Sequence, residues 1–441
     1  MASLLKKILA SLITIGMLLP INGFSNMGRS MRKNPKTATA WAAWEQGDLE
    51  NARKLSEELI MGHETSDAGH FILSLIAHVQ GDHQSAIKHQ AQISPKYEWL
   101  SFLDEPVLWS YIHSGDIKGA LDFAVRRNMP ESVATRLKVS LDKPFSVELD
   151  GVIILPFTND KLSPYMPGFK AVICGQNTVV RLDTGGSFVN LSSEQADKYG
   201  IKAVVCGEGF SSLTTGKICY GTASELTLGS AVLKNVPVII HYGTLSSKGI
   251  YDAFGVELGP IIGTNILQQF MTTIDGPGKR MILSKRANEK VRNEHRNMIS
   301  NIQGNAYEQP FAMWSDHYMI VNGRANSRSG RFFVDTGLVV ANGVQGQAAL
   351  LASHETLKSW NAPIAETPMF PQIPGEFCIG PVCRKNITAF PVEDNVWENF
   401  GDWGGIDVTA MVSWGFLSHY VWTLDFDRYI YTLIEPAKKA E

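Results

Sequence analysis

The chain has 441 residues, of which 44% are hydrophobic and 19% are charged, and its formal net charge is −3. This length is enough for more than one domain with a buried core. The nearly neutral charge, without a cluster of basic residues, argues against nucleic acid as a partner.

The first residues have the form of a signal peptide. Lys6 and Lys7 precede an apolar run, 8–21, which is followed by the small residues of 23–25. The run is shorter than the roughly 20 residues that a membrane helix needs. We therefore expect residues 1–25 to be a signal peptide and the protein to be exported, either periplasmic or secreted. An uncleaved membrane anchor is the alternative.

Residues 37–140 contain three copies of the pattern Gly-Asp-x-x-x-Ala. The copies begin at Gly47, Gly81 and Gly115, so both steps are 34 residues (81 − 47 and 115 − 81). This period is typical of tetratricopeptide-like helical hairpins, in which Gly ends one helix and Asp caps the next. We predict an all-α helical repeat here. Its concave surface binds a peptide, a protein partner or the β-rich part of this chain; the alternative is a packing extension that has no separate ligand.

Beyond residue 140 the pattern becomes that of β-strands. A predicted hairpin at 169–183 ends in Asp183-Thr184-Gly185. A second hairpin at 317–335 ends in Asp335-Thr336-Gly337, so the two aspartates are 152 residues apart (335 − 183). The same tripeptide thus ends a hairpin in each half of the region.

The residues that follow the two tripeptides also match. Gly263 and Gly415 each lie 80 residues after an aspartate (263 − 183 and 415 − 335), and strand-forming segments follow at 271–283 and 422–433. A chain of this length is expected to contain roughly 0.1 copies of Asp-Thr-Gly by chance. The pattern therefore indicates an internal duplication, which brings one carboxylate from each half toward a shared site.

Cysteines bracket a predicted hairpin in each half. Cys206 and Cys219 flank a glycine-rich segment, and Cys378 and Cys383 flank a tighter turn. Because export allows disulfides to form, we predict that each pair is bonded and that Cys174 is a buried thiol. The histidines have no spacing typical of metal ligands, so we expect no metal and no cofactor.

The two halves resemble the aspartic peptidases, the superfamily of pepsins and retropepsins. The resemblance covers 145–436, about two-thirds of the chain. It implies a multidomain protein in which the helical repeat precedes an all-β bilobal pair of acid-protease-like barrels. Lobe one is expected at 145–286, an inter-lobe linker with a short helix at 287–310, and lobe two at 311–437. Since one chain holds both lobes, we expect a monomer.

In this family a pair of aspartates activates the water that attacks the peptide bond. One carboxyl is ionised and takes a proton from water, while the other is protonated and donates to the carbonyl oxygen. The resemblance assigns these roles to Asp183 and Asp335. It also implies that the glycines permit the tight turns and that the threonines bond the opposite loop. These supporting residues are Thr184, Gly185, Thr336 and Gly337.

A few positions depart from the family pattern. Gly186 and Leu338 follow the two tripeptides, where the family often has Ser, Thr or Ala, and Ser187 could replace the missing hydroxyl in lobe one. Trp414 stands where lobe one has Ile262. These departures leave open a protein that keeps the cleft without turnover.

In this family a β-hairpin flap covers the substrate and excludes water. The first candidate is the hairpin at 206–220, and the hairpin at 374–383 is the alternative. The flap candidates of the first hairpin are Ser211, Thr214, Gly216 and Tyr220.

The sequence as a whole predicts an exported aspartic endopeptidase that acts on a peptide or protein substrate. Two alternatives remain. One is a catalytically inactive bilobal peptide- or protein-binding protein, and the other is an adaptor whose main role lies in the helical repeats.

Overall fold

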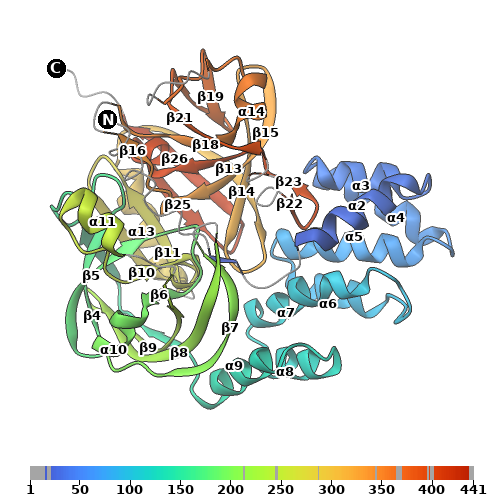
Figure 1. Ribbon diagram of the computed structural model, residues 1–441, viewed down its shortest axis with the longest axis horizontal. Coiled ribbons are helices and arrows are strands. Elements are labelled where there is room, and N and C mark those ends of the chain that lie inside the picture. The colour runs from blue at the N-terminus through green and yellow to red at the C-terminus, as the bar shows by residue number, and fades with distance from the viewer. Residues whose placement is uncertain are drawn as a thin grey trace.

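A computed structural model describes residues 15–16, 21–211, 214–243, 247–286, 288–342, 345–363, 370–394, 397 and 402–436. An N-terminal helical region precedes a β-rich region (Figure 1), which confirms the predicted order of an α part and a β part. No helix among the described residues is long and apolar enough to cross a membrane. The predicted signal peptide lies mostly outside them. Its described parts are β1 (Ile15–Gly16) and the start of α2 (Ile21–Lys33).

The helical region has a helix break at each Gly-Asp step. Gly47, Gly81 and Gly115 have φ angles of 68°, 79° and 82°, which glycine adopts without strain. The aspartate after each glycine caps the next helix by accepting a bond from a backbone N–H three residues on. Whether these helices are tetratricopeptide repeats remains a prediction. The elements are α3 (Ala38–Glu45), α4 (Leu49–Met61), α5 (Ser66–Val79), α6 (His83–Ala91), η1 (Leu100–Leu103), α7 (Asp104–His113), α8 (Ile117–Arg126) and α9 (Glu131–Asp142).

A nine-stranded sheet forms most of lobe one, in the order β1-β7-β8-β4-β5-β10-β6-β9-β2. Its short strand β10 runs parallel to β5, with Ile262 opposite Leu182. The segment before Gly263 therefore passes beside the strand that leads to Asp183. The elements are β2 (Ser146–Glu148), β4 (Gly168–Ile173), β5 (Gln176–Leu182), β6 (Val189–Ser192), α10 (Ser193–Lys198), β7 (Ala203–Ser211), β8 (Thr214–Leu228), β9 (Ala231–His241), α11 (Ser247–Phe254), β10 (Ile261–Ile262) and α12 (Thr264–Leu267).

Lobe two repeats this arrangement. Strand β24 runs parallel to β15, with Ser413 opposite Asp335, so the segment before Gly415 again passes beside the Asp-bearing strand. The elements are β13 (Gly304–Trp314), β14 (Tyr318–Ala325), β15 (Arg328–Asp335), β16 (Ala341–Asn342), β17 (Gly346–Gln347), β18 (Leu350–Ser353), α14 (His354–Ser359), β19 (Glu376–Ile379), β20 (Val382–Lys385), β21 (Ala389–Val392), β22 (Asp402–Trp403), β23 (Ile406–Asp407), β24 (Ala410–Ser413) and α16 (Trp414–Leu417).

The closing strands of the two lobes form one sheet. Strand β11 (Phe270–Asp275) pairs antiparallel with β25 (Val421–Asp425), and β12 (Arg280–Lys285), β3 (Val152–Pro156) and β26 (Ile430–Pro436) extend it on both sides.

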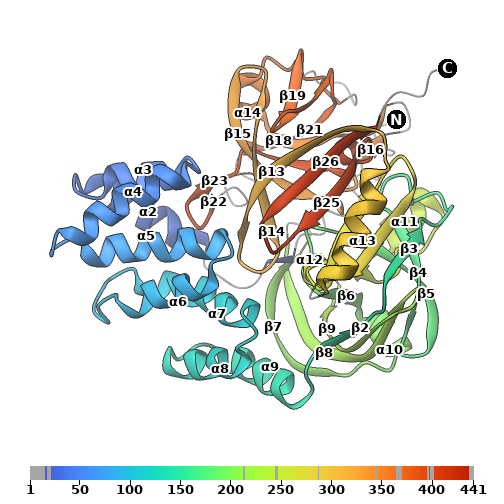
Figure 2. The same ribbon diagram turned by 180° about the vertical axis from the view of Figure 1, so that it is seen from behind.

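The segment between the lobes differs from the expected linker. It contains α13 (Glu289–Ser300), longer than the predicted short helix, and Figure 2 shows this helix in front of the sheet of closing strands. Residues from Gly304 onward already belong to β13, which pairs with β26 from Gly304 opposite Pro436 to Pro310 opposite Ile430. The second half of the segment is therefore sheet, because the edge of β26 offers it a full ladder of backbone partners.

The helical region and lobe two share one hydrophobic core. Trp41 and Trp44 of α3 belong to the same cluster of buried side chains as Trp314, Phe333 and Leu338 of lobe two. The indole N–H of Trp44 also donates to the backbone oxygen of Gly404 at 2.9 Å. We call this cluster the shared core.

Candidate active site

Asp183 and Asp335 occupy corresponding positions at the ends of β5 and β15. Both are fully buried. In each turn the N–H of the glycine two residues on donates to Oδ1 of the aspartate at 2.8 Å, from Gly185 and Gly337 respectively. Each turn therefore fixes the orientation of its own carboxylate.

Each turn also lies directly against the other turn's carboxylate. A Cβ atom on Gly185 would lie 2.5 Å from Cγ of Asp335, and a Cβ on Gly337 would lie 2.2 Å from Cγ of Asp183. Both distances are too short for non-bonded carbon atoms. Glycine is therefore needed here because the opposing carboxylate occupies the space of a side chain.

The two threonines bond across the pair of turns. The N–H of Thr184 donates to Oγ1 of Thr336 at 2.9 Å, and the N–H of Thr336 donates to Oγ1 of Thr184 at 3.1 Å. Each hydroxyl then donates to a backbone oxygen of the opposite strand, that of Val334 at 2.9 Å and that of Leu182 at 3.3 Å. Four reciprocal bonds thus hold the turns in fixed register.

Replacing Thr184 by Val should loosen this arrangement. Without the hydroxyl, the buried N–H of Thr336 loses its acceptor and the buried oxygen of Val334 loses its donor. Each unsatisfied group costs about 1–3 kcal/mol. We expect a loss of about 2–4 kcal/mol in the free energy of unfolding, measured by urea denaturation. Thr184→Ser keeps the hydroxyl and serves as the control. A Val variant as stable as the Ser variant would contradict the locking role.

Burial sets the electrostatics of the pair. It raises the pKa of both carboxyls, and the charge of Asp335 raises the pKa of Asp183 further. In the described part of the chain, Oδ2 of each aspartate has no hydrogen-bond partner. Two close, buried carboxyls whose outer oxygens are unused can share one proton and bind a water molecule between them.

The departures from the family pattern have different surroundings in the two lobes. Leu338 is 1% exposed and packs into the shared core, so an apolar side chain suits its position. Trp414 is 2% exposed, and its ring meets that of Phe157 edge-on at 5.9 Å. Ser187 is buried, and within the described residues its hydroxyl makes no hydrogen bond to Asp183.

The first flap candidate is a long hairpin of β7 and β8, cross-linked by the Cys206–Cys219 disulfide. Ser211 and Thr214 form its last described backbone pair, and 212–213 lie outside the described residues. Gly216 pairs with Gly209, four residues nearer to the tip than Tyr220. Tyr220 lies at the base instead, where the guanidinium of Arg136 from α9 is 4.1 Å from the centre of its ring.

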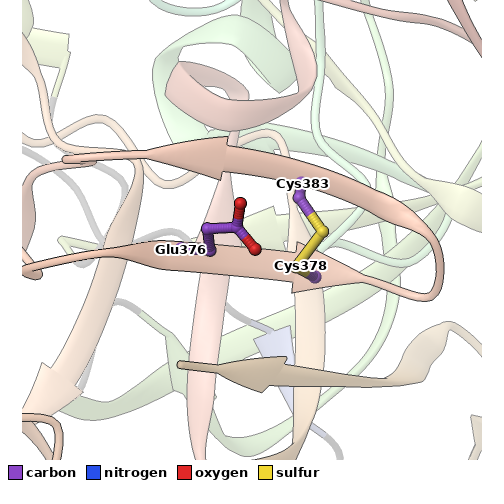
Figure 3. A group of neighbouring side chains, drawn as sticks. All are labelled: Glu376, Cys378 and Cys383. Atoms are coloured by element: carbon purple, nitrogen blue, oxygen red, sulfur yellow. A yellow bond between two sulfur atoms is a disulfide. The ribbon is translucent and has the colours of Figure 1, made fainter. Parts of the chain in front are cut away.

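The second hairpin, of β19 and β20, holds the Cys378–Cys383 disulfide, so both predicted disulfides are present. It pairs with the end of β14, and Figure 1 shows it at the outer end of lobe two. Figure 3 shows Glu376 beside this disulfide. Because both sulfur atoms are bonded to each other, neither is a thiolate that could bind a metal.

The remaining cysteine departs from its prediction. Cys174 is free and only half-buried, and its sulfur accepts a bond from the hydroxyl of Ser224. It lies in the turn between β4 and β5, with a φ angle of 47°.

A buried polar cluster near Asp183 and Asp335 was not predicted from the sequence. The hydroxyl of Ser315 donates to Glu105 of α7 at 2.7 Å, and Asp316 bonds the ring of His317 at 2.5 Å. Burial raises the pKa of Glu105 to about 7, against the opposing effect of the Ser315 bond. The run Ser315-Asp316-His317 just before a predicted strand was the available signal, whereas nothing in the helical pattern marks Glu105.

Arg181 was also missed, although it precedes Asp183 by two residues. Its side chain is 1% exposed and bonds Asp160 and Ser163, both at 3.0 Å. A single charged residue inside the apolar strand 179–182 was the signal for a buried ion pair. This pair ties the strand that carries Asp183 to the loop before β4.

Comparisons with known proteins find similar solved structures but no related sequence. No protein-family model matches the chain, and no curated protein matches its sequence. The chain is similar to a retropepsin-like aspartic protease from Rickettsia conorii, with 19% identity and a TM-score of 0.22 over 32% of this chain and 92% of that chain. It is also similar to an aspartic proteinase from Irpex lacteus, with 12% identity and a TM-score of 0.39 over 65% and 98%. Neither similarity is strong enough to carry a functional argument.

Proposed function

We propose that the protein is an exported aspartic endopeptidase whose catalytic pair is Asp183 and Asp335. The observation that carries this proposal is the reciprocal geometry of the two turns, in which each glycine faces the carboxylate of the other turn. Such proximity serves no evident packing purpose, because burying two carboxyls without full hydrogen bonding destabilises a fold. A site that needs one shared proton explains it.

The proposed chemistry follows from the raised pKa values. One carboxyl keeps a proton while its partner is ionised, so the ionised member takes a proton from water and the protonated member donates to the carbonyl oxygen of the peptide bond. The hairpin of β7 and β8 covers the substrate. Because one chain supplies both aspartates, the proposed enzyme is complete as a monomer, periplasmic or secreted.

The test is cleavage of a mixed peptide library between pH 3 and 8 by the mature protein. Asp183→Asn and Asp335→Asn should each lower kcat/KM by roughly 10³-fold or more, because each removes one partner of the proton transfer. Circular dichroism confirms that the variants fold. Equal cleavage by either Asn variant would contradict the proposal, and no cleavage by the folded wild type at any pH would favour a binding protein without turnover.

A further inference from the structure

A mostly apolar cavity of about 100 Å³ lies between the helical region and lobe one. Helices α7 and α9 form one wall, and strands β7, β8 and β9 form the other. Figure 1 shows these helices beside the flap hairpin. The side chains that make its apolar surface include Trp109, Ile112, Leu137, Phe188, Tyr220 and Val238.

Two of these residues connect the cavity to the candidate active site. Phe188 follows Asp183 by five residues, and its backbone oxygen accepts a bond from the N–H of Gly263 at 2.7 Å. Its ring lies 6.3 Å from that of Trp109 in α7. Tyr220 lies on β8 next to Cys219 of the hairpin disulfide. The cavity is therefore bordered by the segment that leads from the first aspartate turn into β6, and by the base of the flap hairpin.

The cavity also reaches the surface. Val204 of β7, one of its lining residues, is 48% exposed, and Tyr220 is only half-buried. A packing void sealed inside a core would have neither property. Exposed valine at the mouth of an apolar pocket costs solvation free energy that an apolar ligand would recover.

Its size and lining define the ligand. A larger apolar cavity, of about 150 Å³, is known to hold a benzene ring, so a cavity of about 100 Å³ suits one aliphatic side chain. A leucine-sized group that fills it removes apolar surface from water on both sides, which favours binding. The lining also includes two basic residues, Arg136 and Lys143, so a basic side chain would meet like charge there and would lose its hydration.

We propose that this cavity is a specificity pocket that binds one bulky apolar side chain of the peptide substrate, and that the helical region supplies half of it. The proposal rests on the proposed function for the identity of the substrate, but peptide binding in the pocket does not require turnover. It gives the helices a role in choosing the substrate.

The test is a substitution on α9 that places a larger side chain in the pocket. Ser140 lines the cavity, whereas its neighbour Leu141 is 41% exposed and does not. Ser140→Phe should lower kcat/KM at least tenfold for library peptides with Leu or Met at one substrate position, while peptides with Ala there change little. Leu141→Phe adds an aromatic ring to the same helix and should leave the profile unchanged. Leu137→Ala, which enlarges the pocket, should shift the preference toward larger side chains.

A binding measurement separates this inference from the proposed function. Affinities of the same peptides are measured by fluorescence anisotropy on the full chain carrying Asp183→Asn, with and without Ser140→Phe. Weaker binding of apolar peptides with Ser140→Phe supports the pocket even if the wild type cleaves nothing. Normal cleavage with a profile that Ser140→Phe leaves unchanged overturns the pocket and leaves the peptidase standing. Absence of both binding and cleavage overturns both. If Ser140→Phe does not fold, Ser140→Leu replaces it.

Discussion

Replacing Gly337 by Ala is expected to abolish cleavage and to destabilise the fold. The added methyl would lie 2.2–2.5 Å from three atoms of the Asp183 carboxyl group. Neither group can yield freely, because the N–H of Gly185 holds that carboxylate and the threonine bonds hold the turns. Overpacking of this kind costs about 1–3 kcal/mol, and a displaced carboxylate should lower kcat/KM by roughly 10²-fold or more.

A neighbouring glycine provides the matched control. A Cβ on Gly186 would meet its nearest atoms, in Asn190 and Asp183, at 3.3 Å, which small shifts can accommodate. Gly186→Ala should therefore have a much smaller effect on stability and cleavage. The double variant Gly337→Ala, Asp183→Ala removes the clash and should recover stability without activity. If the double variant is as unstable as the sum of its single changes, the steric explanation is wrong.

The second large effect is on the stability of the fold at acid pH. Replacing His83 by Gln is expected to make the protein more stable relative to the wild type as the pH falls from 6.5 to about 4. The expected gain across this window is on the order of 3 kcal/mol, measured as the difference between urea unfolding free energies at each pH. The surface variant His63→Gln serves as the control and should show no such trend.

The reason is a group of histidines in the helical region. The rings of His83 and His113 stack at 5.0 Å, and that of His78 lies 6.2 Å from His83. Burial lowers the pKa of His78 to about 3, of His83 to about 4 and of His113 to about 3. Below pH 6.5 the unfolded chain takes up protons that the folded protein does not, so each histidine reduces stability as the pH falls toward its folded pKa.

The comparison between variants is needed because other groups act in the opposite direction. The pKa values of Asp183, Asp335 and Glu105 are raised by burial, so these carboxyls take up protons in the folded protein at a higher pH than in the unfolded chain. These carboxyls therefore stabilise the fold as the pH falls, whereas the histidines destabilise it. If the His83→Gln variant shows the same pH dependence of stability as the wild type, His83 takes up its proton at the same pH in the folded protein as in the unfolded chain, and the explanation is wrong.

Features encoded by local motifs could be predicted from the sequence. The turns at Asp183 and Asp335 and the Gly-Asp helix caps each depend on a few adjacent residues. The disulfides could be predicted because each joins the two strands of one hairpin. The contact between Glu105 and Ser315 could not, because it joins residues 210 apart and exists only once the helices dock on lobe two. For the same reason the contact of Leu338 with the helices could not be predicted.

The shared core has a consequence for how such a chain can evolve. The indole side chains of α3 and Leu338, which directly follows the second Asp-Thr-Gly, belong to one buried cluster. A substitution in the helices therefore changes the packing behind the turn that carries Asp335, and the two parts must change together. Removing the helices would leave Trp314 and Phe333 facing water. The helical region is thus not a domain that can be exchanged independently. The sequence of either part limits which substitutions the other part tolerates.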